Sequence, residues 1–409
     1  MNASVPLNPV DLIQLIKSNN LPVIIFGAST VGEVLSHHLQ EQGIVVTAFT
    51  ENQTHKADQL FCGIEVIHTS KLQEQFKDAN FIISAADIED VIHQLNELGF
   101  YHTHAAGTLI QEIDLEKIMY SAPVDFVEFA VSACITCHDS FLSPDTVSLR
   151  SVDIMVTEKC SLKCTDCSNL MQYFKEPVHY QLDEMLQSVE TLCASVDSIH
   201  EFRVIGGEPL MNKNVYGVIE KLSNIDKVKR VVIYTNGSIP INMKYIDILQ
   251  NSKVILMITS YGDLSKNLSK MESVCDEYNI TYHTRPAQGW TDSSKISQHH
   301  RDTKAQNDVF QSCCAKSLYT LSEGELHRCP FSANAARLGA IPDYKSDYIN
   351  LLDSSIASSD NKKHMQKFTS NMTEALSACD FCNGRPLDDP QITPGIQTKD
   401  ILDYTRIRT

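Results

Sequence analysis

The chain has 409 residues and a formal net charge of −17 at pH 7. This length exceeds one ordinary hydrophobic core and predicts more than one domain. The negative charge disfavours a general affinity for nucleic acid or for an anionic membrane, because phosphates and acidic lipids would be repelled. A small substrate that is not a polyanion, or one that is locally chelated, fits this balance better.

The N-terminus lacks the basic start and apolar run of a signal peptide, and no uninterrupted apolar stretch is long enough to span a bilayer. We therefore expect a cytoplasmic protein without a membrane span. In a reducing cytosol, thirteen cysteines that include C-x2-C pairs indicate metal or cluster binding more than disulfides.

Residues 1–115 are predicted to form a small doubly wound α/β domain. An apolar strand over residues 23–26 is followed by a glycine turn and a helix, and the pattern of strand and helix then repeats. Gly27 permits the tight turn and Gly32 permits close packing of the helix. Glu51 ends the next strand, where a carboxylate can meet a ribose hydroxyl.

This arrangement resembles the Rossmann-like N-terminal domain of bacterial sugar acyltransferases and related polysaccharide-locus proteins. The resemblance implies a nucleotide-linked sugar or a similar ligand at the glycine turn. Ala28-Ser29 stands where the middle glycine of the dinucleotide-binding fingerprint would be. A purely structural role, docking against the main domain, is the alternative.

Residues 116–150 are predicted to be a linker. They contain Cys134-Ile135-Thr136-Cys137-His138, which has the spacing of a haem c attachment site. Haem is attached outside the cytoplasm, so without an export signal we expect a further metal site or, by default, an incidental pair.

Strands and helices alternate over residues 151–300, which predicts a parallel sheet with helices outside it. This is most of a barrel and not a closed eight-fold one, and in such barrels the chemistry gathers on the loops that follow the strands. The expected strands cover residues 152–156, 201–205, 230–234, 253–259 and 280–283, and the expected helices cover 182–194, 215–223, 243–249 and 263–278.

Three cysteine-bearing or glycine-bearing loops follow the first three of these strands. Cys160, Cys164 and Cys167 follow the first strand, Gly206-Gly207-Glu208-Pro209 follows the second, and Asn236-Gly237 follows the third. Three closely spaced thiolates can hold three corners of a four-iron cluster and leave the fourth iron open to a ligand. The sequence therefore predicts that these loops meet on one rim.

The spacing C-x3-C-x2-C together with the GGEP segment strongly resembles the radical S-adenosylmethionine (SAM) superfamily. The resemblance covers about residues 151–290 and implies a partial (β/α)6 barrel whose three cysteines hold a [4Fe-4S] cluster, with SAM on the open iron. It also implies that Gly206, Gly207, Glu208 and Pro209 contact the methionine end of SAM, and that Asn236 and Gly237 contact its ribose and carboxylate regions.

Two observations qualify this resemblance. The residue before the last cysteine is commonly aromatic in the family and packs near the adenine, whereas here it is Asp166. Adenine must then be contacted differently. A structural zinc site completed by a distant cysteine is the alternative reading of the three cysteines.

A second set of cysteines lies in residues 301–390. Cys314 and Cys329 flank a predicted hairpin, and Cys379 and Cys382 form a C-x2-C pair. This set resembles the twitch and SPASM extensions of radical SAM enzymes, which hold auxiliary iron-sulfur clusters. No cysteine follows Cys382, so the shorter twitch type with one auxiliary cluster is the better match.

The ligands of this second site are left open in two respects. Cys313 can take the place of its neighbour Cys314, and a four-cysteine zinc site can use the same hairpin and C-x2-C geometry. Residues 391–409, rich in proline and polar side chains, are predicted to be a tail that wraps or frays.

The resemblance implies an enzyme that reductively cleaves SAM to methionine and a 5′-deoxyadenosyl radical, which abstracts hydrogen from a substrate. The protein positions the reactants and excludes water. The Rossmann-like domain favours a small-molecule substrate such as an activated sugar or polysaccharide precursor. An electron donor such as flavodoxin or ferredoxin is also implied.

Two other functions are the alternatives: a peptide-modifying twitch or SPASM maturase, and a non-catalytic iron-sulfur protein that senses redox state or transfers electrons. Possible substrate contacts on or beyond the later strands are Tyr261, Arg285, Trp290 and Asp292. A packing role for the rings and solvated charges for the others are equally compatible with the sequence.

Overall fold

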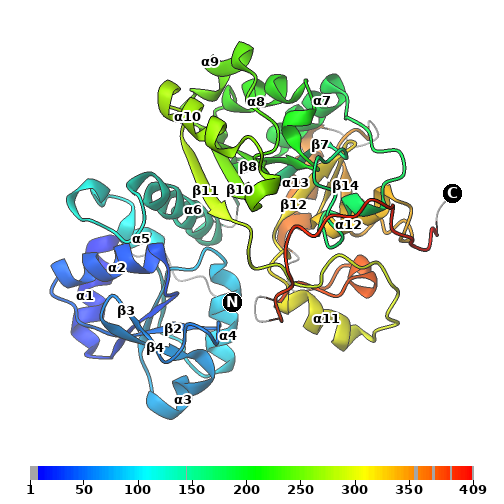
Figure 1. Ribbon diagram of the computed structural model, residues 1–409. Coiled ribbons are helices and arrows are strands. Elements are labelled where there is room, and N and C mark those ends of the chain that lie inside the picture. The colour runs from blue at the N-terminus through cyan, green and yellow to red at the C-terminus, as the bar shows by residue number, and fades with distance from the viewer. Residues whose placement is uncertain (1–7, 144, 354–357, 371–373, 387–388, 408–409) are drawn as a thin grey trace. The chain divides into compact units, whose positions relative to one another are not determined.

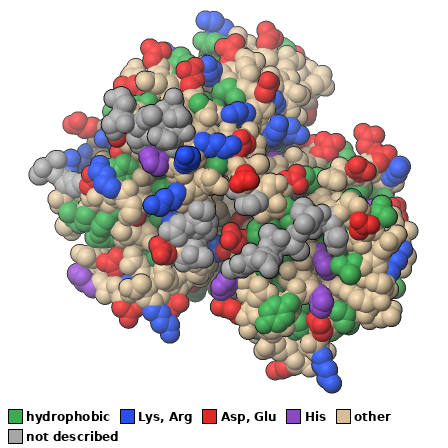
Figure 2. Space-filling view, turned by 180° about the vertical axis from the view of Figure 1, so that it is seen from behind, with side chains coloured by type: hydrophobic (Ala, Val, Ile, Leu, Met, Phe, Trp, Pro, Cys, Tyr) green, Lys and Arg blue, Asp and Glu red, His purple; other side chains and the backbone are tan. Residues whose placement is uncertain are grey.

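The computed structural model describes residues 8–143, 145–353, 358–370, 374–386 and 389–407 (Figure 1). The chain divides into two compact units, Met1–Ser148 and Leu149–Thr409. Within the described ranges, no helix combines the length and the apolar character needed to cross a membrane. On the face shown in Figure 2, acidic and basic side chains are interspersed.

The first unit contains a six-stranded sheet in the order β3-β4-β2-β1-β5-β6. Neighbouring strands are parallel except for β3 and β4, which are antiparallel. The strands are β1 (Val23–Phe26), β2 (Val46–Glu51), β3 (Leu60–Phe61), β4 (Ile64–His68), β5 (Asn80–Ile83) and β6 (Thr103–Ala105). This is the doubly wound α/β arrangement predicted from the sequence.

The sheet of the first unit is covered on both faces. Val23 and Ile25 belong to one buried cluster and Ile24 and Phe26 to another, as expected because successive side chains of a strand point to opposite faces. A strand buried on both faces is apolar throughout, which explains the run Val-Ile-Ile-Phe. The helices are α1 (Pro9–Asn19), α2 (Thr30–Glu41), α3 (Leu72–Gln75), α4 (Ile88–Glu97), α5 (Ala106–Ile110) and α6 (Val124–Leu142).

The turn after β1 needs its glycines. Gly27 has φ of +115°, and a Cβ there would lie 2.6 Å from the hydroxyl oxygen of Ser84. A Cβ at Gly32 would lie 2.2 Å from the carbonyl oxygen of Gly27, which is too close for any side chain. The roles predicted for both residues, a tight turn and close helix packing, agree with this geometry.

The linker predicted over residues 116–150 is wrong. Most of that stretch forms α6, and its side chains Val127, Val131 and Cys134 belong to the same core as α1 and α2. The first unit therefore continues to Ser148. The sequence misled here because the helix carries apolar residues on more than one face, so its periodicity is weak.

The second unit contains an eight-stranded open sheet in the order β11-β10-β9-β8-β7-β12-β13-β14. Its strands are β7 (Ser148–Thr157), β8 (Ser198–Gly206), β9 (Val228–Thr235), β10 (Val254–Ser260), β11 (Tyr282–Pro286), β12 (Tyr319–Ser322), β13 (Glu325–His327) and β14 (Tyr348–Asn350). The five barrel strands predicted from the sequence are thus present as β7 to β11. A partial barrel, and not a closed one, is confirmed.

Helices follow the parallel strands of the second unit, as the alternating pattern predicted. They are α7 (Leu182–Ser195), α8 (Val215–Ser223), α9 (Ile246–Leu249) and α10 (Leu268–Tyr278), and in Figure 1 they line the outer side of the sheet. Further along the chain come α11 (Thr303–Ser312), α12 (Pro330–Arg337) and α13 (Ser358–Ser370).

The cysteine-rich extension is continuous with the barrel sheet. The predicted hairpin is present as the antiparallel pair β12 and β13, and β12 also pairs in parallel with β7. The hairpin thus extends the sheet beside the first barrel strand. Consequently the predicted regions 151–300 and 301–390 lie within one compact unit.

The C-terminal segment, residues 391–407, wraps back over the loop that carries the first three cysteines. The amide of Thr165 donates to the carbonyl of Ile396 (2.8 Å), and the amide of Thr398 donates to the carbonyl of Lys163 (2.9 Å). Further on, the amide of Leu402 donates to the carbonyl of Gln172 (3.1 Å). The last two residues of the predicted tail lie outside the described ranges.

Candidate functional site

The three predicted loops meet in one pocket, which we call the main pocket. Its empty space is about 1200 Å³ including the open mouth. The walls come from the loops after β7, β8 and β9 and from β10, β11 and the residues after them. Its lining residues include Cys160, Cys164, Cys167, Ser168, Arg203, Gly206, Gly207, Tyr234, Asn236, Tyr261, Arg285 and Trp290.

The cysteine loop is buried enough to keep its thiols protonated before iron binds. Burial raises the pKa of Cys160 to about 11 and that of Cys164 to about 12, and burial also raises the pKa of Cys167. Backbone N–H groups act in the opposite direction on Cys160 and Cys167, because they favour the thiolate. Iron binding at these sulfurs must therefore release protons.

Gly206 and Gly207 let the end of β8 pack directly against the cysteine loop. A Cβ at Gly206 would lie 2.2 Å from the carbonyl oxygen of Thr157, and a Cβ at Gly207 would lie 2.2 Å from that of Lys159. The amide of Gly207 donates to Thr157 (2.9 Å) and that of Glu208 donates to Lys159 (2.8 Å). The two glycines thus join the GGEP loop to the cysteine loop, backbone to backbone, besides lining the pocket.

Glu208 lies behind the pocket wall. Its side chain is fully buried and accepts hydrogen bonds from the hydroxyl of Thr235 (2.8 Å), the amide of Asn236 (2.8 Å) and the amide of Leu210 (3.2 Å). Burial raises the pKa of Glu208 to about 7 against these hydrogen bonds. This geometry favours a role for Glu208 in fixing the loop over the direct SAM contact that the resemblance implies.

Of the remaining predicted SAM contacts, one lines the main pocket and two do not. Asn236 lines the main pocket, and its amide nitrogen donates to the hydroxyl of Ser161 (3.1 Å). Pro209 is buried and Gly237 is in the left-handed conformation at φ of +69°, and neither belongs to the pocket lining. Asp166, the departure from the family pattern, accepts from the hydroxyl of Thr165 (2.8 Å) and does not line this pocket either.

Three of the four possible substrate contacts line the main pocket. Tyr261 and Trp290 meet edge to face with their ring centres 6.1 Å apart, and Arg285 lies nearby on β11. Asp292 does not line the pocket; it forms an ion pair with Lys295 at 2.6 Å. This placement favours the alternative given for Asp292, a solvated charge.

Sequence reasoning missed Arg203 and Tyr234, which also line the main pocket. Both lie within predicted strands, whereas most of the predicted site residues lay in the loops that follow the strands. A charged residue inside an otherwise apolar barrel strand, as in Glu201-Phe202-Arg203-Val204, was the available signal, because such a position is costly unless it is paired or functional.

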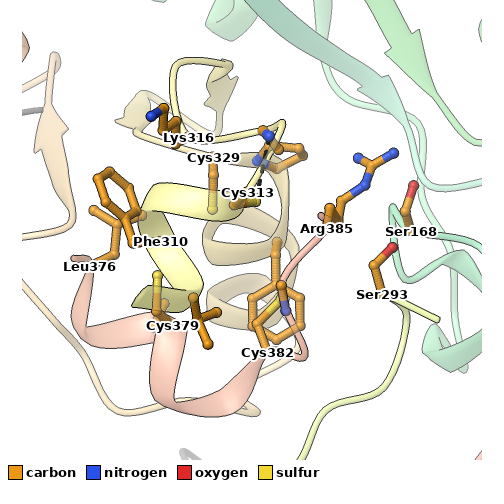
Figure 3. A pocket seen from close by; sticks show the side chains of 16 residues that line it. Ser168, Ser293, Phe310, Cys313, Lys316, Cys329, Leu376, Cys379, Cys382 and Arg385 are labelled. Carbon is orange, nitrogen blue, oxygen red and sulfur yellow. Dashed lines mark hydrogen bonds between the residues drawn. The ribbon is translucent and has the colours of Figure 1, made fainter. Parts of the chain in front are cut away.

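A second pocket is lined by four cysteines of the extension (Figure 3). They are Cys313, Cys329, Cys379 and Cys382, and the space they surround is about 520 Å³ including its opening. Cys314 is exposed and does not line this pocket. Between the two neighbours, which the sequence could not separate, the geometry therefore favours Cys313 and corrects the choice of Cys314.

Backbone amides point at three of these four sulfurs. The amide of Ala315 donates to Cys313 (3.4 Å), that of Ser332 donates to Cys329 (3.3 Å), and that of Gly384 donates to Cys382 (3.2 Å). Burial raises the pKa of Cys379 and Cys382 to about 12, and burial also raises the pKa of Cys329 well above its ordinary value. Amide donors to buried sulfur fit cluster ligation, because such bonds stabilise the thiolate and tune an iron-sulfur centre.

In the described parts of the chain, no group of three or more His, Cys, Asp or Glu side chains is arranged to hold a single metal ion. The ligands of an iron-sulfur cluster bind different iron atoms, so their sulfurs need not converge on one point. Both cysteine sets fit an iron-sulfur cluster because the cysteines of each set line one pocket and because backbone amides donate to their sulfurs.

Cys134, Cys137 and His138 do not form a ligand set. His138 is fully buried on α6; its Nδ1 accepts from the amide of Gly107 (2.9 Å) and its Nε2 donates to the carbonyl of Ala85 (2.8 Å). Burial lowers the pKa of this imidazole. With both ring nitrogens hydrogen-bonded to backbone, His138 has a structural role in the first unit, in line with the incidental reading.

The predicted ligand loop of the first unit makes its own polar contacts. Ser29 caps α2 by accepting from the amide of Gly32, and Glu51 pairs with Lys56 at 3.3 Å. The Lys56 ammonium also donates to the carbonyl of Ala28 (3.3 Å). A cation therefore lies beside the glycine turn, and Glu51 is engaged with it.

Comparison with known proteins agrees with the architecture of the second unit. Residues 154–263 match the family model of the radical SAM superfamily. GTP 3′,8-cyclase of Alkaliphilus metalliredigens is 32% identical over 93 residues, which is 22% of this chain and 28% of the relative. GTP 3′,8-cyclase of Staphylococcus haemolyticus is 31% identical over 93 residues, 22% of this chain and 27% of the relative. The chain thus spans under a third of the length of these curated relatives.

Two solved structures are also similar. BtrN in complex with AdoMet and 2-DOIA has a TM-score of 0.38 and 17% identity, covering 63% of this chain and 98% of BtrN. Streptococcus suis SuiB bound to precursor peptide SuiA has a TM-score of 0.30 and 12% identity, covering 47% of this chain and 44% of SuiB. Given the family match, the segment 154–263, which carries the three cysteines and the GGEP loop, is a radical SAM domain, as its motifs predicted.

Proposed function

We propose that the chain is a radical SAM enzyme that holds a [4Fe-4S] cluster on Cys160, Cys164 and Cys167 and binds SAM in the main pocket. One observation carries the proposal: the three cysteines line the same pocket as Gly206 and Gly207. The amides of Gly207 and Glu208 also donate to the carbonyls of Thr157 and Lys159, directly before Cys160, and so join the two loops. When bound, the cluster supplies the electron that cleaves SAM to methionine and a 5′-deoxyadenosyl radical.

The chain's own residues prepare this site. Gly206 and Gly207 hold the end of β8 against the cysteine loop, and Glu208 fixes Asn236 in the pocket wall. Tyr261 and Trp290 supply apolar ring surface over the pocket, which excludes water from a reactive radical. Each of these roles is one of position and exclusion, because the cofactor carries the difficult chemistry.

We further propose a twitch-like auxiliary iron-sulfur cluster on Cys313, Cys329, Cys379 and Cys382. Ser168, next to Cys167 in sequence, lines both the main pocket and the second pocket. The two cysteine sets are therefore close enough to share a wall, which favours electron exchange between them. A cytoplasmic location and an electron donor of the flavodoxin or ferredoxin kind remain predictions from the sequence.

The test is anaerobic reconstitution with iron and sulfide, followed by an assay for 5′-deoxyadenosine from SAM under reduction. The wild type should form the product, and the triple variant Cys160/Cys164/Cys167→Ala should lose it entirely. Cys62→Ala, which removes an exposed cysteine of the first unit, is the matched control and should retain activity. No product from a fully loaded wild type would favour the non-catalytic alternative.

Iron and sulfide counts test the assignment of two clusters. About four irons should remain in the triple variant, because the auxiliary cysteines are intact. Zinc in place of iron and sulfide after aerobic purification, with no gain on reconstitution, would support a zinc site at these four cysteines instead.

For the substrate we propose an activated, nucleotide-linked sugar or polysaccharide precursor. The sheet order of the first unit reverses beside β1, between β2 and β5, and ligands of open α/β sheets bind at such a switch point. Gly27 and Ser84 lie at the ends of the two strands concerned, with Lys56 beside the turn. The relatives' name, GTP 3′,8-cyclase, refers to a nucleotide, which favours this substrate over a peptide.

Calorimetric titration of the full chain with nucleoside diphosphate sugars tests this substrate class. Saturable binding should be lost in Gly27→Val, whose side chain would meet Ser84, and kept in Val45→Ala, an exposed change in the same unit. No saturable binding by the wild type would leave the first unit with a docking role.

A further inference from the structure

The main pocket is cationic although the chain as a whole is strongly acidic. Apart from the cysteines, the charged side chains among its described lining residues are Arg203 and Arg285, and no Asp or Glu lines it. The chain carries a formal charge of −17, so a wall with two arginines and no carboxylate is not what composition alone would produce.

Arg203 reaches the pocket from the middle of the sheet. Its Nε lies 2.9 Å from the Oδ1 of Asp153, a fully buried carboxylate on the neighbouring strand β7. The guanidinium carbon stands 4.7 Å from the centre of the Tyr234 ring. Asp153 and Tyr234 therefore hold the Arg203 fork in one orientation at the pocket wall.

Arg285 approaches the same ring from β11. Its guanidinium carbon is 6.0 Å from the centre of the Tyr234 ring, and the residue is exposed. The structure gives Arg285 no hydrogen bond or ion pair with another described residue. Arg203 and Arg285 thus flank one aromatic ring, and the second of them has its donors free for a ligand.

We propose that Arg203 and Arg285 together bind an anionic group, a phosphate or a carboxylate, of the molecule that reacts in the main pocket. Planar guanidinium forks pair with such groups through charge-assisted hydrogen bonds, often two at a time. The ring of Tyr234, which lies near both arginines, adds aromatic surface to the same pocket wall. This inference rests on the proposed function, since it names the substrate class of the same site.

A carboxylate could reach this place from two sources: the substrate, or the methionine end of SAM itself. A binding experiment with SAM alone separates the two sources, because it contains the SAM carboxylate and no substrate. The substrate is unidentified, so pyrophosphate and malonate serve as probes of the anion site.

The experiment compares the reconstituted wild type with Arg285→Gln, Arg203→Lys and the control Arg230→Gln. Arg230 lies on β9 but does not line the pocket. Arg203→Lys keeps a positive charge beside Asp153, so the fold is spared while the fork is lost. Three quantities are measured at constant ionic strength: the affinity for pyrophosphate or malonate, the affinity for SAM, and the rate of 5′-deoxyadenosine formation without substrate.

The wild type and Arg230→Gln should bind pyrophosphate or malonate saturably, and Arg285→Gln and Arg203→Lys should bind at least about tenfold more weakly. SAM affinity and 5′-deoxyadenosine formation should stay within about twofold of wild type in Arg230→Gln. In Arg285→Gln and Arg203→Lys, SAM affinity should fall by much less than the affinity for pyrophosphate or malonate. A fall in SAM affinity that matches the fall in anion affinity would assign the arginines to the SAM carboxylate and overturn the inference.

Absence of saturable anion binding by the wild type would also overturn it. If the wild type forms no 5′-deoxyadenosine while its anion binding depends on the two arginines, then the proposed function fails and the anion site stands. The two failures are therefore distinguishable.

Discussion

At the scale of single residues, Glu208 governs the main pocket without being part of its wall. Its carboxylate accepts from Thr235, Asn236 and Leu210, and these bonds hold the loops after β8 and β9 together. A buried group that accepts three hydrogen bonds on two oxygens must be a carboxylate here, because the amide of a glutamine has only one accepting oxygen.

Glu208→Gln is expected to weaken SAM binding about tenfold with little change in overall shape. One or more buried donors lose their acceptor, and such a loss costs about 1–3 kcal/mol. Equilibrium dialysis of the reconstituted protein with SAM measures the effect. Glu220→Gln, an exposed change on α8, is the control, and equal SAM affinity in both variants would refute the role given to Glu208.

The neighbours Cys313 and Cys314 provide a second test at this scale. Cys313→Ser should lower the iron content by about four atoms per chain or make the auxiliary cluster labile, because Cys313 lines the second pocket. Cys314→Ser should leave the iron content unchanged, because Cys314 is exposed. Iron and sulfide analysis after anaerobic reconstitution separates the two, and the opposite result would restore Cys314 as the ligand.

Local sequence predicted which residue types matter but not which of two adjacent residues faces inward. Cys313 and Cys314 are equivalent by spacing. Which sulfur enters the pocket depends on how the chain leaves the end of α11 and on its backbone contact with residues 382–385. For the same reason Arg203 was missed: its importance depends on Tyr234 and Arg285, which belong to other strands.

At the scale of elements, the C-terminal segment stands out because it pairs with the cysteine loop. Gln397 forms an isolated antiparallel bridge with Cys164, and its side-chain nitrogen donates to the carbonyl of Leu162 (2.7 Å). Gly395 lies against Tyr261, where a Cβ would come within 2.7 Å of the ring. The segment thus restrains both the loop and one aromatic wall of the main pocket.

Gln397→Ala is expected to loosen the cysteine loop and to speed the loss of iron in air by about two- to fivefold, since one hydrogen bond of this kind contributes about 1 kcal/mol. The decay of the cluster's visible absorbance gives the rate. Gln391→Ala, an exposed change in the same segment, serves as the control. Identical decay in the two variants would mean that the segment does not protect the loop.

The wrapped conformation of this segment lay beyond sequence reasoning. A proline-rich polar stretch is compatible with wrapping and with fraying, and the choice depends on whether backbone partners such as Lys163 and Gln172 are within reach. Strand β10, in contrast, was predictable because it begins with an apolar run over residues 254–258, as expected for a parallel strand covered on both faces.

At the scale of the whole molecule, the second unit buries ionisable groups that make its stability depend on pH. Burial raises the pKa of Asp153 to about 7 from an ordinary value of 3.8, and nearby Arg203 opposes this shift. Between these two values the folded chain keeps a proton that the unfolded chain releases, so the folded state is favoured at low pH and loses stability as pH rises through about 7.

Asp153→Asn should therefore reduce the fall in the free energy of unfolding between pH 5 and pH 7.5. Urea unfolding of the cluster-free chain at the two pH values, followed in the transition of the second unit, measures the change. Asp263→Asn, in an exposed turn, should keep the wild-type slope. A slope in Asp153→Asn equal to that of wild type would show that Asp153 is not protonated in the folded state.

The sequence by itself determined the motifs of this protein and the order of its elements. The C-x3-C-x2-C and GGEP motifs, the glycine turn after β1 and the order of strands and helices are local patterns, fixed by spacing and periodicity. The tertiary structure alone decided that α6 joins the first unit, that Cys313 and not Cys314 faces the second pocket, and that two arginines flank Tyr234. These outcomes depend on residues far apart in the chain being packed together, and no local pattern encodes which of them meet.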